Sequence, residues 1–147
     1  MAELDAEHVD FRAFVVEAQH DGERALIRGD VGPRLEMWSH RDPVTLFAAV
    51  GVTKAGWREL EPTFHRVASR LTDGRGVRFD LLAFDVSGDV AWSAGVARFV
   101  VSMDGGPPAP VVIRLTHAYR HEDGAWKVVH EHSDFQPPDH QIPPADG

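Results

Sequence analysis

Acid–base side chains are concentrated in two β-rich segments near the carboxyl end of the chain. The first segment, residues 114–120, carries His117, and the second, residues 125–134, carries Glu131. An imidazole titrates near neutral pH, and a neighbouring carboxylate fixes its tautomer and raises its basicity. Such a pair suits proton abstraction next to a carbonyl, or assisted dehydration or cyclisation. The other interpretation is a polar cross-strand pair on a solvated or dimer-facing sheet surface.

The Asp-Gly turn between the two segments decides which side chains share a face of the hairpin. A three-residue loop over residues 122–124, with Gly124 left-handed, would set His117 beside Val129. One face then carries Leu115, His117, Tyr119, Val129, Glu131 and Ser133. The other face carries Arg114, Thr116, Trp126, Val128, His130 and His132. A two-residue turn would shift the pairing by one residue and place His117 beside His130.

Other side chains could contact a ligand. Tyr119, Trp38 and Trp92 suit a flat, apolar, ring-bearing molecule, although aromatic residues are also ordinary core residues. Arg98 and Arg114 interrupt apolar strands, so each is expected either to hold an anion in a pocket or to pair at a dimer face. The aromatic residues make a small hydrophobic molecule the expected ligand.

The alternating histidines of the last strand have a spacing seen in metal sites. His130 and His132 project to one face together with Asp134. The spacing alone is a weak signal for a metal, and the alternative is a set of histidines that only form hydrogen bonds. We therefore predict no metal ion and no other cofactor.

The composition limits the class of partner. A chain of 147 residues is one ordinary domain, and its net charge of −8 disfavours nucleic acid and anionic membranes as partners. The lack of cysteine removes thiol catalysis, disulfides and Cys-ligated zinc. Residues 1–5 are acidic and contain no apolar signal-peptide segment. We expect a cytoplasmic protein without a nucleic-acid or membrane partner.

The hydrophobic pattern predicts helices first and strands after them. A long first helix should run from about Phe11 to Gly29, and a second should carry the apolar stripe of residues 57–71, capped by Thr53 and ended by residues 73–76. Short elements, a turn of helix at 35–38 and a strand at 44–47, lie between them. Strands are expected at residues 77–86, 90–103, 110–121 and 125–135.

This order predicts an α+β fold, with helices gathered on one face of an antiparallel sheet. Gly95 lies inside a long strand and indicates a bulge or bend that curls the sheet. A curled sheet closed by the first helix on its concave face makes a cone with a small-molecule pocket. We expect the domain to span residues 1–135 and to be followed by a loose Pro-rich tail, residues 136–147.

Short motifs along residues 5–135 together carry a family resemblance. They are Trp38-Ser39, Asp42-x-Val44-Thr45-Leu46-Phe47, Gly56-Trp57, Gly88-Asp89-Val90-Ala91-Trp92, Thr116-His117-Ala118-Tyr119-Arg120, Asp123-Gly124-x-Trp126 and His130-x-His132. These motifs resemble those of the SnoaL-like proteins of the nuclear transport factor 2-like superfamily, which have a cystatin-like fold. The closing hairpin is also similar to the association domain of calcium/calmodulin-dependent kinase II. The resemblance implies a cone-shaped α+β fold and a homodimer formed through the sheet.

The resemblance also bears on the site. In the kinase association domain the positions that match His117 and Ser133 line the pocket, which favours the first hairpin face as the interior. Two enzyme types of the superfamily are disfavoured. Residues 46–50 lack the catalytic aspartate of the ketosteroid isomerases, and the acidic set of the limonene epoxide hydrolases is not recognisable, although Glu131 falls near one of its aspartates.

Two classes of function follow from these observations. The first is a cofactor-free isomerase, cyclase or dehydratase that acts on a hydrophobic carbonyl-bearing metabolite, with His117 and Glu131 as the working pair. The second is a noncatalytic ligand-binding or assembly module whose pocket holds a small acid through Arg98 or Arg114. On the first hypothesis His117→Ala should abolish turnover or ligand binding at little cost in stability.

Overall fold

The computed structural model describes residues 5–137 and consists of three helices and six strands. In chain order these are α1 (Ala6–Leu26), α2 (Gly32–Met37), β1 (Thr45–Ala48), β2 (Val52–Ala55), α3 (Trp57–Ser69), β3 (Leu71–Ser87), β4 (Val90–Met103), β5 (Ala109–Glu122) and β6 (Ala125–Phe135). Apart from Gln136 and Pro137, the predicted Pro-rich tail lies outside the described residues.

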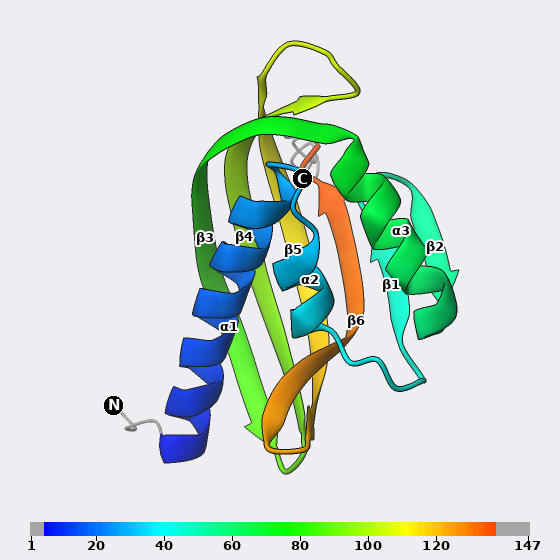
Figure 1. Cartoon of the computed structure of the whole chain (residues 1–147). Helices are drawn as coiled ribbons and strands as arrows, with labels where there is room; N and C mark the ends of the chain where they lie inside the picture. The colour runs from blue at the N-terminus through cyan, green and yellow to red at the C-terminus, as the bar shows by residue number, and fades with distance from the viewer. Residues whose placement is uncertain (1–4, 138–147) are drawn as a thin grey trace, which may run out of the picture.

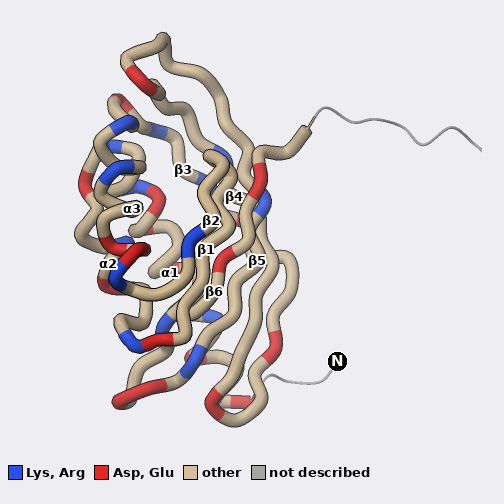
Figure 2. Tube along the Cα trace, turned by 90° about the vertical axis from the view of Figure 1, so that its right-hand side faces the viewer, with Lys and Arg blue, Asp and Glu red and all other residues tan. Residues whose placement is uncertain are grey.

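The six strands form one curved, unclosed sheet in the order β2-β1-β6-β5-β4-β3, and the predicted α+β class is confirmed. All neighbouring strands are antiparallel except β1 and β6, which run parallel, so the sheet is mixed. The helices lie in front of the sheet in Figure 1, and the edge-on view of Figure 2 places all three on the same side. We call the helix-covered side the inner face and the opposite side the outer face.

Helix α1 packs on the inner face through one stripe of buried side chains. Phe11, Val15 and Leu26 occupy this stripe, and the first two belong to the main hydrophobic core together with Trp38 and Tyr119. The Asp5 carboxylate accepts the N–H of His8 and caps the first turn. Apolar burial along this stripe holds the helix against the sheet.

The segment before α3 forms an additional strand that the sequence pattern did not predict. Thr53 lies in β2, opposite Phe47 of β1, and does not cap the helix. Instead Asp42 accepts the N–H of Trp57, with an N–O distance of 2.8 Å. Local spacing does not reveal this cap, because Asp42 lies 15 residues from Trp57 in the sequence.

Strand β3 begins at Leu71, so the glycine-rich stretch at residues 73–76 is not simply the end of a helix. Two register shifts fall between Thr72 and Arg78, where the strand bends around the end of α1. A Cβ atom added to Gly74 would lie 2.2 Å from Ile27. Gly74 therefore permits a close approach between β3 and the segment that follows α1.

A β-bulge in β6 sets the register of the closing hairpin. Asp123 and Gly124, with φ of 50° and 78°, form a two-residue turn, because Glu122 pairs directly with Ala125. Val129 is the extra residue between the pairs Tyr119–Val128 and Ala118–His130. The three-residue loop expected from the sequence is therefore wrong, and the two-residue alternative is right at the turn. The Val129 bulge then shifts the pairing by one residue, so His117 pairs with Glu131 and not with His130.

The bulge also changes which residues face inward. Val128 is fully buried in the core, and the rings of Trp126 and Phe11 lie 5.1 Å apart. Both residues were assigned to the outer face from strand alternation, which a bulge reverses locally. The predicted irregularity at Gly95 falls on the partner strand, where Leu82 is the extra residue of β3. No helix of residues 5–137 is long and apolar enough to cross a membrane.

Candidate functional site

His117 on β5 and Glu131 on β6 form a buried pair on the inner face of the sheet. Their side chains are 1% and 6% exposed, and His117 Nε2 lies 2.8 Å from Glu131 Oε1. The two residues are direct partners in the strand register. With Glu131 ionised, Nε2 must carry the proton, which leaves Nδ1 as the basic nitrogen of the neutral ring.

Three further charged or polar side chains extend this pair into the helices. Arg34 of α2 is 3% exposed, and its Nη1 atom lies 3.5 Å from Glu131 Oε1. Its Nη2 atom lies 2.8 Å from Glu23 Oε1 on α1, and Gln19 donates to the same Glu23 oxygen at 2.8 Å. We call Gln19, Glu23, Arg34, His117 and Glu131 the interior cluster. With neutral His117 it carries two negative charges and one positive charge.

Two buried members of the interior cluster, Glu131 and Arg34, stay charged. Burial by itself would raise the pKa of Glu131, but the hydrogen bond with His117, the charge of Arg34 and the Ser133 hydroxyl hold that pKa below its usual value. Burial would lower the pKa of Arg34, but Glu23 and Glu131 hold it above its usual value.

Ser133 and Tyr119 flank the pair on the same face. The Ser133 hydroxyl donates to Glu131 Oε2 at 3.2 Å and accepts the N–H of Ala49 at 3.0 Å. The Tyr119 hydroxyl lies 2.7 Å from that of Ser93, and its ring centroid lies 5.8 Å from that of His117. Burial raises the pKa of Tyr119, so its phenol stays protonated and can donate a hydrogen bond.

The remaining predicted ligand-binding residues do not join this group. Trp38 is 1% exposed and packs against Phe64 in the core. Trp92, 47% exposed, lies on the outer face of β4. Arg98 and Arg114 are exposed and pair with Asp80 and Asp134 respectively. The expectation that either arginine holds an anion in an interior pocket is therefore wrong, since strand alternation turns both outward.

The histidines of β6 lie on the outer face. His130 Nδ1 is 2.6 Å from the Thr45 hydroxyl, and the rings of His130 and His132 contact Phe47 edge-on. Burial is the main cause that lowers the pKa of His130. Within residues 5–137 no three histidine or acidic side chains converge in a way that could hold a metal ion.

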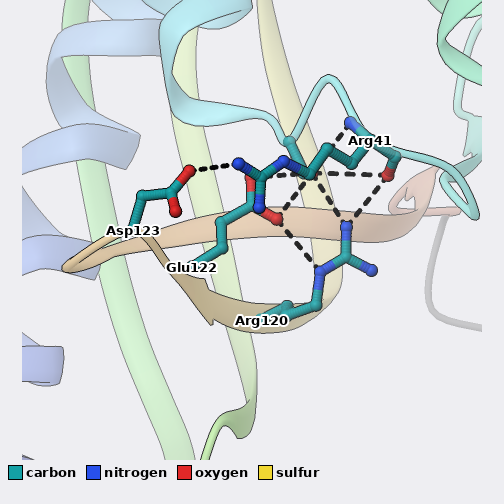
Figure 3. A network of polar contacts seen from close by, with 5 residues as sticks. Arg41, Arg120, Glu122 and Asp123 are labelled. Atoms are coloured by element: carbon teal, nitrogen blue, oxygen red, sulfur yellow. Dashed lines mark hydrogen bonds and ion pairs between the residues drawn. The ribbon is translucent and has the colours of Figure 1, made fainter.

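A second polar network ties the hairpin turn to the loop that follows α2 (Figure 3). Ser39 donates to both carboxylate oxygens of Glu122, at 2.9 and 3.0 Å, and Arg120 donates to Glu122 and to the Arg41 carbonyl oxygen. Arg41 also pairs with Asp123. These contacts fix the end of the hairpin against the segment that carries Trp38.

The interior pair is enclosed in this conformation. Neither His117 nor Glu131 lines the five best-formed clefts of residues 5–137. This burial changes the expected cost of His117→Ala, because the substitution would leave a void and deprive Glu131 of a partner. The expectation that His117→Ala costs little stability is therefore revised.

Sequence reasoning missed Gln19, Glu23 and Arg34. The first two lie on the buried stripe of α1, spaced four residues apart like Phe11 and Val15 before them. Polar residues at successive apolar positions of a helix were the available signal. Arg34 has no comparable signal, since it lies in a six-residue helix without a clear apolar stripe.

Solved structures with the same fold come from several bacteria. A putative calcium/calmodulin-dependent protein kinase II association domain from Xanthomonas campestris is 21% identical, with 93% of this chain and 91% of that chain covered and a TM-score of 0.64. A putative dehydratase of the NTF2-like family from Streptomyces avermitilis is 16% identical, with 89% and 97% covered and a TM-score of 0.68.

A nuclear transport factor 2-like superfamily protein from Salmonella enterica is 14% identical, with 95% of this chain and 99% of that chain covered and a TM-score of 0.71. At these identities the likeness establishes the fold. No curated protein sequence matches the chain. The family model described as SnoaL-like domain matches residues 17–136, from the middle of α1 to the end of β6. The match covers both strands of the closing hairpin and the whole interior cluster, and the chain belongs to the SnoaL-like domain family.

Proposed function

We propose that this domain binds a small hydrophobic molecule and acts on it as a cofactor-free acid–base enzyme of the isomerase, cyclase or dehydratase type. The observation that carries the proposal is the buried contact of 2.8 Å between His117 Nε2 and Glu131 Oε1. Membership of the SnoaL-like family supports a small-molecule-binding domain. The proposed substrate carries a carbonyl group, because its neighbouring C–H is acidic enough for an imidazole base.

Each group near the pair has a role in this proposal. His117 removes the proton, and Glu131 stabilises the imidazolium that forms. Arg34 and Ser133 keep Glu131 ionised and oriented, so they are positioning residues. The neutral Tyr119 phenol can donate to a developing enolate oxygen. Since His117 is 1% exposed, the substrate reaches it only when the helix layer moves relative to the sheet.

Proton exchange at carbon tests the proposal without knowledge of the natural substrate. Cyclic ketones such as 2-tetralone would be incubated with the protein in D2O, and loss of the α-proton signal would be followed by NMR. Acid–base catalysis contributes roughly 10²–10⁴-fold. His117→Ala should therefore reduce the enzyme-dependent rate at least about 100-fold, while His130→Ala, which removes an outer-face histidine, should not. Retention of the rate in a folded His117→Ala variant would contradict the proposal.

The alternative function is a noncatalytic ligand-binding or assembly module. It is favoured by the enclosure of His117, whose ring already has a carboxylate partner. Binding of the cyclic ketones without any enzyme-dependent exchange of their α-protons would support this alternative.

We also propose a homodimer formed through the outer face of the sheet. Phe47, Val90 and Trp92 expose 39%, 62% and 47% of their surface there. Trp126 and Val128, which strand alternation assigned to the outer face, lie in the core and do not contribute to this interface. The large exposed apolar side chains carry the proposal instead, since a face of this kind is commonly buried across a two-fold axis.

A further inference from the structure

One cleft of the surface is lined by cationic side chains and by no carboxylate. It lies where the carboxyl end of α1 meets the bent first part of β3 (Figure 1), and its volume is about 270 Å³. Arg24, Arg28 and Arg75 line it together with His20. Each of the other four best-formed clefts of residues 5–137 includes at least one aspartate or glutamate. We call this one the α1–β3 cleft.

Two segments place the arginines around the cleft. His20, Arg24 and Arg28 are spaced by four residues, so α1 and the turn after it present them on one side. Arg75 comes from β3, between two register shifts in the pairing with β4. The N–H of Gly74 donates to the Ile27 carbonyl oxygen at 3.0 Å, in a contact too close for a Cβ atom. This backbone contact fixes Arg75 beside the end of α1.

The three guanidiniums have little compensation from the protein. Within residues 5–137 neither Arg24 nor Arg75 takes part in an ion pair, and Arg28 has one long contact of 3.5 Å, from Nε to the Gly74 carbonyl oxygen. By contrast, Arg70 and Arg114 each bind both oxygens of an aspartate. A local excess of cations is notable in a chain whose net charge is −8. Like charges held together repel, and a bound anion would relieve that repulsion.

The helix end accounts for only part of this arrangement. Cations near the carboxyl end of a helix stabilise it, which gives Arg24 and Arg28 a structural role. The same reason does not extend to Arg75, which lies on a strand. The carboxyl end of a helix carries about half a negative charge, so three guanidiniums leave the cleft clearly positive.

The donors and the size of the cleft indicate a small molecule that carries a phosphate group. A guanidinium binds two oxygens side by side, and a phosphate has enough oxygens and charge to be bound by more than one arginine. Ile27 and Val77 also line the cleft and offer aliphatic surface to the organic part of an ester. The volume suits a molecule smaller than the drug-sized ligands of large pockets. A nucleic acid is disfavoured, since the net charge of the chain repels a polyanion.

We propose that the α1–β3 cleft binds the phosphate group of a small, soluble phosphomonoester. Arg24 and Arg28 hold the phosphate from the side of α1, Arg75 holds it from β3, and His20 adds a further donor. None of the lining residues belongs to the interior cluster, so the site is independent of the reaction proposed for His117.

Two probes with the same ring test the preference for phosphate. Binding of phenyl phosphate and of benzoate, which carries a single charge, would be measured on the full chain by NMR titration. Phenyl phosphate should bind at least about tenfold more tightly, with the largest shifts at residues 20–28 and 74–77, and inorganic phosphate should compete with it. Equal affinity for the two probes, a lack of saturable binding, or shifts centred elsewhere would overturn the proposal.

A lipid headgroup presents the same chemistry and is tested separately. Vesicles of phosphatidylcholine that contain phosphatidic acid should not retain the protein, because their negative surface repels a chain of net charge −8. Retention on these vesicles without binding of phenyl phosphate would overturn the assignment to a soluble ester.

Matched substitutions test the arginines. Arg24→Gln and Arg75→Gln should each weaken phenyl phosphate binding about tenfold or more, because each removes a charge-assisted hydrogen bond. Arg12→Gln is the control, since it makes the same change of charge on α1 but lies in a neighbouring cleft that contains Asp80. Its effect should stay below about twofold, because salt screens charges at a distance.

The three substituted side chains are exposed, so the variants should fold, which thermal unfolding checks. Phenyl phosphate should raise the Tm of the wild type more than that of Arg75→Gln, since only a bound ligand stabilises the folded state. Wild-type affinity in folded Arg24→Gln and Arg75→Gln, or an equal loss in Arg12→Gln, would overturn the proposal. Loss of binding in Arg75→Gln with unchanged proton exchange of the ketones would support a site separate from His117.

Discussion

Arg34 in the interior and Arg114 on the outer face both contact carboxylates, but in opposite environments. Arg34 is 3% exposed and lies between Glu23 and Glu131, whereas Arg114 is about half exposed and pairs with Asp134 at 2.7 Å. Water competes for the outer pair and screens it, so its net contribution to stability is small. The inner ions have lost their hydration and depend on one another.

The same contrast applies to the histidines of the two faces. His117 contacts a buried carboxylate, whereas His130 contacts a hydroxyl and an exposed phenylalanine ring. Only the inner histidine has the ionised partner that acid–base chemistry needs. Residue type alone therefore does not distinguish a candidate site from a solvated surface, because burial decides which pairs of polar side chains are tightly coupled.

The largest expected effect is on stability and comes from removing the inner arginine. Arg34→Met should lower the free energy of unfolding by about 3–5 kcal/mol, because it leaves Glu23 and Glu131 buried without a cation. Chemical denaturation measures this change. Arg114→Met is the matched control and should leave the unfolding free energy unchanged within error. Equal losses in the two variants would refute the contrast between the faces.

The second prediction concerns the association of the outer faces. Trp92→Lys should weaken the proposed homodimer roughly tenfold or more, because a charge replaces a central apolar contact. Sedimentation velocity over a range of concentrations measures the association. Leu82→Lys is the control, since Leu82 is 69% exposed but lines a cleft beside α1. A wild-type protein that stays monomeric at micromolar concentration would exclude the dimer.

The smallest predicted effect is the acid sensitivity of the inner pair. The pKa of Glu131 is lower in the folded protein than its usual value of 4.5, so its contribution to stability is present above pH 4.5 and is lost as the pH falls through the lowered value. Glu131→Gln should remove this part of the acid destabilisation, which urea unfolding at pH 3 to 7 measures.

The outer counterpart of that experiment is Asp134→Asn. The pKa of Asp134 is lowered mainly by its hydrogen bond with Arg114, so the sign of its pH dependence is the same, but 1 M salt should abolish the effect. The Glu131 effect should persist in salt, because a buried pair is screened much less than an exposed one. Identical salt responses would contradict this difference.

Strand alternation predicted that Leu115, His117 and Tyr119 share one face of their strand and that Glu131 and Ser133 share one face of theirs. The turn did not join the two sets correctly, because the observed two-residue turn alone would pair His117 with His130, and the Val129 bulge brings Glu131 opposite His117. Alternation within a strand is local, since side chains alternate with a period of two. The long stripe of α1 was predictable for the same reason. Its polar members Gln19 and Glu23 also interrupt an apolar pattern that is visible in the sequence.

The sequence by itself therefore determined the α+β class and the closing hairpin, with His117 on one strand and Glu131 on the other. Only the tertiary structure decided that Val129 forms a bulge, that Trp126 and Val128 turn inward, and that Arg34 lies between two carboxylates. The bulge depends on the neighbouring strands, and the Arg34 contacts join residues up to 97 positions apart. Such contacts have no local periodicity, so they become visible only when the helices pack on the sheet.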